Sequence, residues 1–433
     1  MRFTSTVATS AVVAVASAQN YLGFNSGATL ANREAKFKAD FKAEFETAAK
    51  LNNSPGKFNS VRLYTNIQAY SEDSPIEAFD AAVETKTNVL LGVWASGTDN
   101  IDKEISALKK AIETHGTDLT DLIIGVTIGS EDLYRVSETG IKNKSGVGNS
   151  PSALVDFVKD WRDAFKSGPL SKIPVGHADT WDAWGNSTNK PVIDAVDFIA
   201  VHEYPYYEDG KGNSIDNAGH LFDRAYQVAI DAAGGKPVWV TETGWPYIGP
   251  DWDEAEASVK NAEKYWQEVG CRKLFNKTPT FWYTLRDSNP DNKMKFAITD
   301  KLSTDPLFDL TCPDHFDTDE PSTTSSTSKS SHSTSTSAPS SETSESASDS
   351  TSTFTTSSPS STPDNGSDNS GSGSNDSNNG GSGSDSSSES TTPTSDASGA
   401  DNTNDPSAAA GLKALSFASY VVLGLAGAAF TLF

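Results

Sequence analysis

The fold is decided by residues 122–132, which read LIIGVTIGSED. This near-continuous apolar run ends directly in the acidic pair Glu131-Asp132. Such a run is typical of a strand that is covered on both faces, as in a parallel sheet. Residues 237–246, which read PVWVTETGWP, repeat the pattern and reach Glu242 at the end of the run. The sequence therefore predicts two buried parallel strands, each followed closely by a glutamate.

Working outward, six further apolar runs are predicted as strands: Tyr21–Asn25, Val61–Tyr64, Val89–Trp94, Pro174–His177, Phe198–His202 and Thr280–Thr284. Between the strands lie stretches with helical periodicity: Ala35–Leu51, Pro75–Thr87, Ile101–His115, Ser152–Lys166, Ala218–Ala233 and Glu254–Val269. Eight strands that alternate with helices predict an α/β fold, a (β/α)8 TIM barrel over residues 19–313. A doubly wound open sheet is the alternative.

Glu131 and Glu242 are the candidate catalytic residues. In an α/β barrel, the carboxyl ends of the strands form the active face, so both carboxylates are expected to point into one cleft. Two carboxylates across a cleft are the catalytic groups that glycoside hydrolysis uses. The alternatives are structural: Ser130 as a helix cap with acids in the first turn, and Glu242 as a surface loop acid.

Aromatic side chains gather at or just beyond the predicted strand ends. Flat rings stack on the apolar faces of sugars, although most tryptophans simply pack in a core or at its rim. Trp184 also lies just beyond a predicted strand end. The predicted substrate contacts are Tyr64, Trp94, Trp181, Tyr204, Tyr206, Trp245 and Trp282.

Other chemistries receive little support from the sequence. Six histidines are widely spread, without metal-ligand spacing, and no serine-hydrolase elbow occurs. We therefore expect neither a metal nor a cofactor. His177, His202 and Asp179 are expected to orient neighbours at strand ends or to make structural hydrogen bonds. The net charge of -24 and the absence of Lys/Arg patches argue against a nucleic-acid partner.

Both ends of the chain read as processing signals. Residues 1–18 predict a signal peptide, with a basic start, a short apolar run and a small-x-small cleavage triplet. Residues 314–398 predict a disordered, O-glycosylated Ser/Thr-rich stalk. Residues 399–433 predict a glycosylphosphatidylinositol (GPI) anchor signal that is removed, with a membrane span as the alternative. The candidate attachment residues are Ser398, Gly399, Asn402 and Asn404.

Cysteines and sequons fit a secreted protein. Cys271 and Cys312 are suited to an oxidising compartment, either as a disulfide or as two buried thiols. The candidate N-glycosylation sites are Asn52, Asn143, Asn186 and Asn276.

The sequence segments at these two strand ends resemble those of one known protein family. Residues 129–135 (GSEDLYR) and 240–246 (VTETGWP) are similar to fungal members of glycoside hydrolase family 17. Further matches are Val61–Thr65, Leu90–Trp94, Gly176–Trp181, Tyr204–Tyr206 and Val269–Cys271. Beyond the catalytic domain, the layout resembles GPI-anchored cell-wall glucan endo-1,3-beta-glucosidases.

The resemblance implies a retaining (β/α)8 enzyme that acts on β-1,3-glucan, with Glu131 as acid/base and Glu242 as nucleophile. It also implies a location at the membrane and cell wall, on the extracellular face, and we expect a monomer. Ser130 stands where related barrels often have Asn, and Glu203 receives no role. The rival functions are a β-1,3-glucan transglucosylase, which uses the same carboxylates, and a non-catalytic glucan-binding wall protein.

Overall fold

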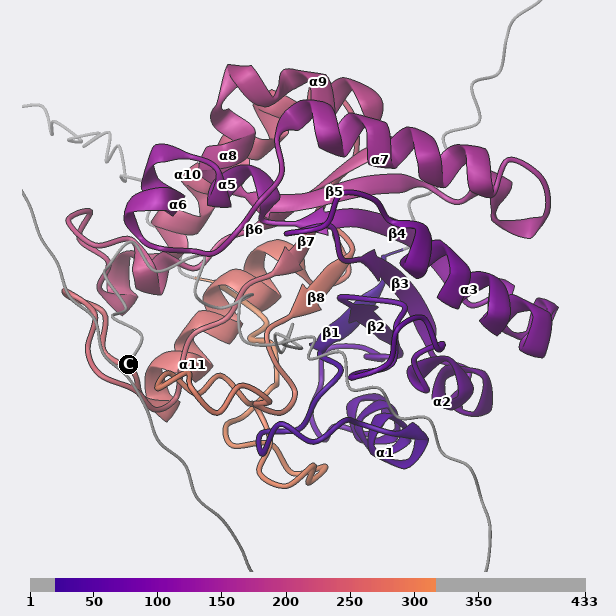
Figure 1. Cartoon of the computed structure of the whole chain (residues 1–433). Coiled ribbons are helices and arrows are strands. Elements are labelled where there is room, and N and C mark those ends of the chain that lie inside the picture. Colours follow the sequence, from indigo (N-terminus) through magenta and orange to yellow (C-terminus); the bar gives the residue numbers. More distant parts are fainter. Residues whose placement is uncertain (1–19, 317–433) are drawn as a thin grey trace, which may run out of the picture. The chain divides into compact units, whose positions relative to one another are not determined.

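Eight parallel strands form a closed barrel in the computed structural model, which describes residues 20–316 (Figure 1). The strands are β1 (Leu22–Ser26), β2 (Ser60–Leu63), β3 (Asn88–Val93), β4 (Ile123–Ser130), β5 (Val175–Thr180), β6 (Phe198–His202), β7 (Val238–Glu242) and β8 (Thr280–Trp282). β1 pairs with both β2 and β8, with Gly23 opposite Phe281, which closes the ring. The predicted TIM barrel is confirmed, and the open-sheet alternative is wrong.

Alternating strand residues supply two separate cores, because successive side chains point to opposite faces of a strand. Val240 belongs to the large core that also includes helix residues, whereas its neighbour Trp239 belongs to a small core made mostly of strand residues. The buried members of this small core are Leu90, Ala178, Phe198, Ala200, Trp239 and Phe281. This division is the one expected of a barrel with a packed interior and a surrounding layer of helices.

Helices lie outside the ring of strands (Figure 1). The longer ones are α1 (Lys38–Ala49), α2 (Ala78–Thr85), α3 (Asp102–His115), α7 (Pro151–Ala164) and α10 (Ile215–Ala233). Shorter helices are α4 (Thr117–Thr120), α5 (Asp132–Arg135), α6 (Glu138–Lys142), α8 (Trp181–Gly185), α9 (Lys190–Ala195) and α11 (Val259–Tyr265). The remaining helical segments are η1 (Pro169–Lys172), η2 (Ser187–Asn189), η3 (Pro205–Tyr207) and η4 (Trp266–Leu274), of which η4 is a π-helix.

The helix predicted over Glu254–Val269 begins later and ends later than expected. Trp252 and Ala255 exchange backbone hydrogen bonds of 2.8 and 2.9 Å, which holds the preceding segment in a turn. Ser258 then caps the helix by accepting a hydrogen bond from the Asn261 N–H. Such a cap satisfies an N–H that the first helical turn cannot pair internally.

A disulfide joins Cys271 to Cys312, which are 41 residues apart. It ties η4 to the last described segment, where the Trp266 indole also donates to the Leu310 carbonyl at 3.1 Å. In the loop-entropy model, a bridge that closes an interval of this length contributes about 4 kcal/mol to stability. The last described segment is thereby held on the barrel.

The sequons differ in their surroundings. Asn52, Asn186 and Asn276 are exposed, whereas Asn143 is buried and its amide donates to the Tyr134 hydroxyl at 3.0 Å. A glycan on Asn143 would have to be attached at a buried side chain that is already engaged in this hydrogen bond.

The predicted signal peptide, almost all of the stalk, and the anchor signal with Ser398, Gly399 and Asn402 lie outside the described residues. Within residues 20–316, no helix has both the length and the apolar character needed to cross a membrane.

Candidate active site

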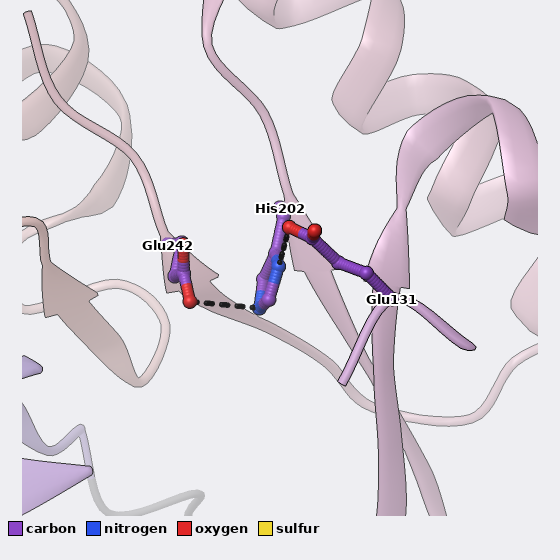
Figure 2. Close-up of side chains that lie close together, drawn as sticks. All are labelled: Glu131, His202 and Glu242. Carbon is purple, nitrogen blue, oxygen red and sulfur yellow. Dashed lines mark hydrogen bonds and ion pairs between the residues drawn. The ribbon is translucent and has the colours of Figure 1, made fainter. Parts of the chain in front are cut away.

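The two predicted glutamates meet at the carboxyl ends of the strands. Glu131 directly follows β4, Glu242 is the last residue of β7, and both are fully buried. Figure 2 shows His202, the last residue of β6, standing between them. One carboxylate oxygen of each glutamate and one ring nitrogen of His202 all lie within 4.8 Å of one another.

A sharp backbone turn delivers Glu131 into the site. Gly129 has a φ of +82°, and a Cβ there would lie 2.5 Å from an Asp132 carboxylate oxygen, so the position requires glycine. Glu131 itself has a φ of +60° and precedes α5. Its N–H donates to the Ala178 carbonyl on β5 at 2.8 Å. The turn lets the chain leave the strand while the Glu131 side chain stays over the barrel.

Glu242 is surrounded by hydrogen-bond donors. The Arg62 guanidinium donates to Oε1 at 2.6 Å and the Tyr64 hydroxyl donates to the same oxygen at 2.9 Å. The Tyr204 hydroxyl donates to Oε2 at 2.9 Å. Burial raises the pKa of Glu242, whereas Arg62 and the two tyrosines oppose that rise because they stabilise the carboxylate. Three donors, one of them charged, favour an ionised Glu242.

Glu131 has fewer donors. His202 Nδ1 lies 2.9 Å from its Oε1, and Arg135 Nη2 lies 3.7 Å from Oε2, which has no hydrogen-bond partner among the described residues. Burial raises the pKa of Glu131 well above its ordinary value. Arg135 opposes the rise, and the charge of Glu242 adds to it. These surroundings favour a protonated Glu131.

His202 is neutral in this setting. Burial, together with the nearby charge of Arg62, lowers its pKa well below the ordinary value. A neutral imidazole carries one N–H. We assign that proton to Nδ1, which then donates to Glu131 Oε1 and leaves Oε2 as the oxygen that carries the carboxyl proton. His202 Nε2 lies 3.7 Å from Glu242 Oε1.

Glu131, His202 and Glu242 offer a carboxylate–imidazole set of the kind that binds metals, but their surroundings do not fit a cation. The guanidinium of Arg62 already lies 2.6 Å from Glu242 Oε1, and that of Arg135 lies 3.7 Å from Glu131 Oε2. An added cation would face two fixed positive charges. Arg62 already balances the charge of Glu242.

Further hydrogen bonds hold Arg62 and the segment that carries Glu131 in place. Arg62 also donates to Asn25 Oδ1 at 2.9 Å and to Ser130 Oγ at 3.0 Å. The role of Ser130 in this structure is therefore to hold Arg62. Asp179 accepts the Leu133 and Tyr134 N–H groups at 2.9 and 3.2 Å and so anchors the start of α5.

His177 supports the same region from β5. Its Nε2 lies 2.9 Å from Asp179 Oδ2, and its Nδ1 lies 2.6 Å from the Ile128 carbonyl. His177 and Asp179 thus orient the segment that carries Glu131, whereas His202 contacts Glu131 directly.

The predicted aromatic contacts divide into two groups. Tyr64 and Tyr204 reach Glu242, and Trp94 lies beneath Arg135, whose guanidinium carbon is 5.4 Å from the ring centroid. Tyr283, which the sequence analysis missed, packs edge-on against Tyr204 with a centroid distance of 5.9 Å. These four rings line the region around the two carboxylates.

Other predicted contacts are engaged elsewhere. The Tyr206 hydroxyl donates to the Pro250 carbonyl, and the Trp245 indole donates to the Glu256 carbonyl at 2.9 Å. Trp282 is buried against Trp266, with a centroid distance of 4.9 Å. Half-buried Trp181 has Lys211 Nζ at 4.9 Å and the Arg224 guanidinium at 5.5 Å from its ring. Substrate contact by this group stays a prediction.

The sequence analysis also missed Arg62 and Arg135. Arg62 stands inside the apolar run Val61-Arg62-Leu63 and is 1% exposed. A charge in the middle of a buried strand requires a partner of opposite charge. An arginine inside an apolar strand can be recognised in the sequence, and it predicts a carboxylate partner inside the barrel.

Several known proteins are similar to this chain. Residues 27–298 match the model of the BtgE/BtgC glycoside hydrolase domain. A protein of Aspergillus terreus named "probable glucan endo-1,3-beta-glucosidase eglC" is 46% identical over 67% of this chain and 60% of its own length. Its namesake in Aspergillus fumigatus strain Af293 is 45% identical over 72% of this chain and 70% of its own length. The chain spans 60% to 63% of the length of the first three such relatives.

Solved structures support the fold. A β-1,3-glucanosyltransferase mutant of Rhizomucor miehei, in complex with laminaritriose, superposes with a TM-score of 0.54. It is 24% identical to this chain, and the alignment covers 67% of this chain and 98% of the other. The family match extends over more than half of the residues, from the loop after β1 to the segment after β8. The chain therefore belongs to the BtgE/BtgC glycoside hydrolase family.

Proposed function

We propose that this protein is a retaining endo-β-1,3-glucanase. The separation of the two carboxylates carries the proposal: an oxygen of Glu131 and an oxygen of Glu242 lie within 4.8 Å of each other. Retaining glycosidases place their carboxyl groups about 5–5.5 Å apart, whereas inverting enzymes leave about 6.5–9.5 Å for a water molecule. The short separation supports direct attack by one carboxylate on the sugar.

The first step uses the contrast in protonation. Ionised Glu242 attacks the anomeric carbon, and the glycosidic bond breaks as Glu131 gives its proton to the departing glucan oxygen. The products are a glycosyl-enzyme ester on Glu242 and a shortened glucan. Arg62 and Tyr204 hold Glu242 in place for the attack.

The second step reverses the roles. Glu131, now ionised, takes a proton from a water molecule, which attacks the anomeric carbon of the ester. The bond to Glu242 breaks, Glu242 regains its negative charge, and Glu131 is protonated again. Both carboxylates return to their starting states, so no cofactor enters the cycle.

The substrate assignment draws on the relatives. Several proteins of 42% to 46% identity are named as glucan endo-1,3-beta-glucosidases, and the aromatic rings around Glu242 suit stacking on glucose units. For location, we propose secretion and GPI anchoring at the membrane and cell wall. The Cys271–Cys312 disulfide supports an oxidising compartment. We further propose that the enzyme acts as a monomer.

Product analysis on a defined β-1,3-gluco-oligosaccharide tests the function, with wild type beside Glu242→Ala. We expect shorter oligosaccharides from wild type, first released as the β-anomer, and none from the variant. Products longer than the starting sugar would assign the enzyme to transglucosylation, in which a glucan hydroxyl replaces water in the second step. Binding without any conversion by wild type would contradict the enzymatic proposal and favour a glucan-binding wall protein.

A further inference from the structure

The last residue of β6 and the segment just after it carry one contact to each catalytic carboxyl group. His202 bonds to Glu131 and Tyr204 bonds to Glu242, each at 2.9 Å. Glu203 lies between these two residues, and its N–H donates to the Glu242 carbonyl at 3.1 Å. Any movement of Glu203 would therefore be transmitted to both carboxylates.

The Glu203 side chain is buried beside a second carboxyl group. Glu203 is 2% exposed and Glu208, which follows η3, is 7% exposed. Glu208 raises the pKa of Glu203 through its charge and through a proton shared between the two carboxyl groups, and sharing it requires that one of them be protonated. Glu208 Oε2 accepts from Arg224 at 2.5 Å and lies 3.3 Å from Lys211 Nζ, so Glu208 is the ionised member. Glu203 therefore carries the shared proton.

The surroundings of Glu203 oppose its ionisation. Burial raises the pKa of Glu203 well above the ordinary value, and the charge of Glu208 and their shared hydrogen bond raise it further. Neither Glu203 Oε1 nor Glu208 Oε1 accepts a hydrogen bond from any other described group. The charged and titratable groups that face the pair come from α8, the loop after η3, α10 and α11: Asp182, Lys211, Arg224 and Tyr265. The nearest cations are used by Glu208.

We propose that Glu203 is a positioning residue whose hydrogen bond to Glu208 holds His202 and Tyr204 against the two catalytic carboxylates. The inference rests on the proposed function. When Glu203 loses its proton to solvent, two negative charges face each other in a buried site, and repulsion separates residues 203 and 208. Tyr204 then moves away from Glu242 and His202 moves away from Glu131. The carboxyl pair thereby sets an alkaline limit on activity that is separate from the ionisation of Glu131.

Kinetics on an activated substrate separates the ionisation of Glu203 from that of Glu131. A 2,4-dinitrophenyl β-laminaribioside has a leaving group that needs no proton, so forming the glycosyl-enzyme does not depend on a protonated Glu131. We expect the pH dependence of kcat/KM for wild type to keep an alkaline limb on this substrate. Glu203→Gln still donates to Glu208 but cannot ionise, and it should move that limb upward by at least one pH unit.

Two further variants complete the kinetic test. Glu203→Leu, which cannot donate, should lower kcat about tenfold while changing KM less than twofold. Glu268→Gln is the matched control, because burial also raises the pKa of Glu268, which lies on η4. This control should keep the wild-type profile. An unmoved alkaline limb in Glu203→Gln would overturn the positioning role.

Thermal unfolding tests the carboxyl pair without any substrate. A folded pKa that is raised above the unfolded one stabilises the protein below the unfolded pKa, and this stabilisation is lost as pH rises through the folded pKa. The Tm of wild type should therefore fall relative to Glu203→Gln as pH increases. A constant Tm difference would overturn the shared proton. Since this measurement needs no activity, it stands even if the enzyme cleaves no β-1,3-glucan.

Discussion

The surroundings of Glu242 and Glu131 differ although both side chains are fully buried. Glu242 accepts hydrogen bonds from Arg62, Tyr64 and Tyr204, all between 2.6 and 2.9 Å. Among the described residues, the carboxyl group of Glu131 has a single hydrogen bond, with neutral His202, and its Oε2 has none. Burial raises the pKa of both carboxyls; the donors to Glu242 oppose the rise there, and the charge of Glu242 adds to the rise at Glu131.

The number of hydrogen-bond donors, and not burial, therefore separates the role of Glu242 from that of Glu131. Burial alone pushes both carboxyls toward the neutral form. Donors aimed at Glu242 counteract that push and keep a nucleophile ionised, whereas Glu131 keeps its proton because it lacks them. Pairs of titratable groups whose environments push their pKa values apart are a common sign of acid and base assignments.

Removing the nucleophile should have the largest effect. Glu242→Ala is expected to lower kcat by about 10⁴-fold or more, since no ester can form. Azide should restore turnover by entering the space left by the carboxylate, and the glycosyl azide should be the α-anomer because attack occurs once, with inversion. Exposed Glu113 on α3 provides the control Glu113→Ala. A β-azide from Glu242→Ala would exchange the two assignments.

Removing the acid/base should have a smaller effect that depends on the substrate. Glu131→Ala is expected to lower kcat/KM about 10²–10⁴-fold on β-1,3-glucan, which has a poor leaving group. An activated aryl glycoside should react with Glu242 almost normally and then accumulate as the glycosyl-enzyme, visible by mass spectrometry. Azide should release this ester as the β-anomer. An equal loss on both substrates would argue against Glu131 as the proton donor.

The meeting of Glu131 and Glu242 follows from the sequence because it depends on strand order alone. Near-continuous apolar runs mark β4 and β7, and parallel strands of a closed barrel bring their carboxyl ends to one face. Arg62 could not be paired with its carboxylate in this way. It lies 180 positions before Glu242, and their contact depends on the directions of side chains inside the barrel.

The aromatic residues show the same limit of prediction from sequence. Tyr204 and Trp245 both follow strand ends, yet Tyr204 reaches Glu242 while Trp245 donates to Glu256 beyond β7. The sequence places each ring near a strand end, but the loop geometry decides whether the ring turns toward the cleft or into the packed rim. The Glu203–Glu208 hydrogen bond is hidden for a related reason, because it depends on the short turn of η3.

The smallest expected effect comes from removing one donor from Glu242. Tyr204→Phe deletes a hydrogen bond to a charged group, which is worth about 1.5–3 kcal/mol and corresponds to roughly a tenfold to hundredfold loss in kcat/KM. With fewer donors, the pKa of Glu242 should rise, so the acidic limb of the pH profile should move to higher pH. Tyr64→Phe should act in the same direction but less strongly, since Tyr64 is only partly buried and water can replace its hydroxyl.

The control for these variants is Tyr207→Phe. Tyr207 is buried next to Tyr204, with a centroid distance of 6.0 Å, but its hydroxyl has no hydrogen-bond partner among the described residues. Removing that hydroxyl should leave the acidic limb where it is in wild type. If Tyr204→Phe and Tyr207→Phe gave the same profile, the donors around Glu242 would not determine its ionisation. The difference between Glu242 and Glu131 would then have to come from the two arginines, because Arg62 contacts the carboxylate of Glu242 at 2.6 Å whereas Arg135 lies 3.7 Å from that of Glu131.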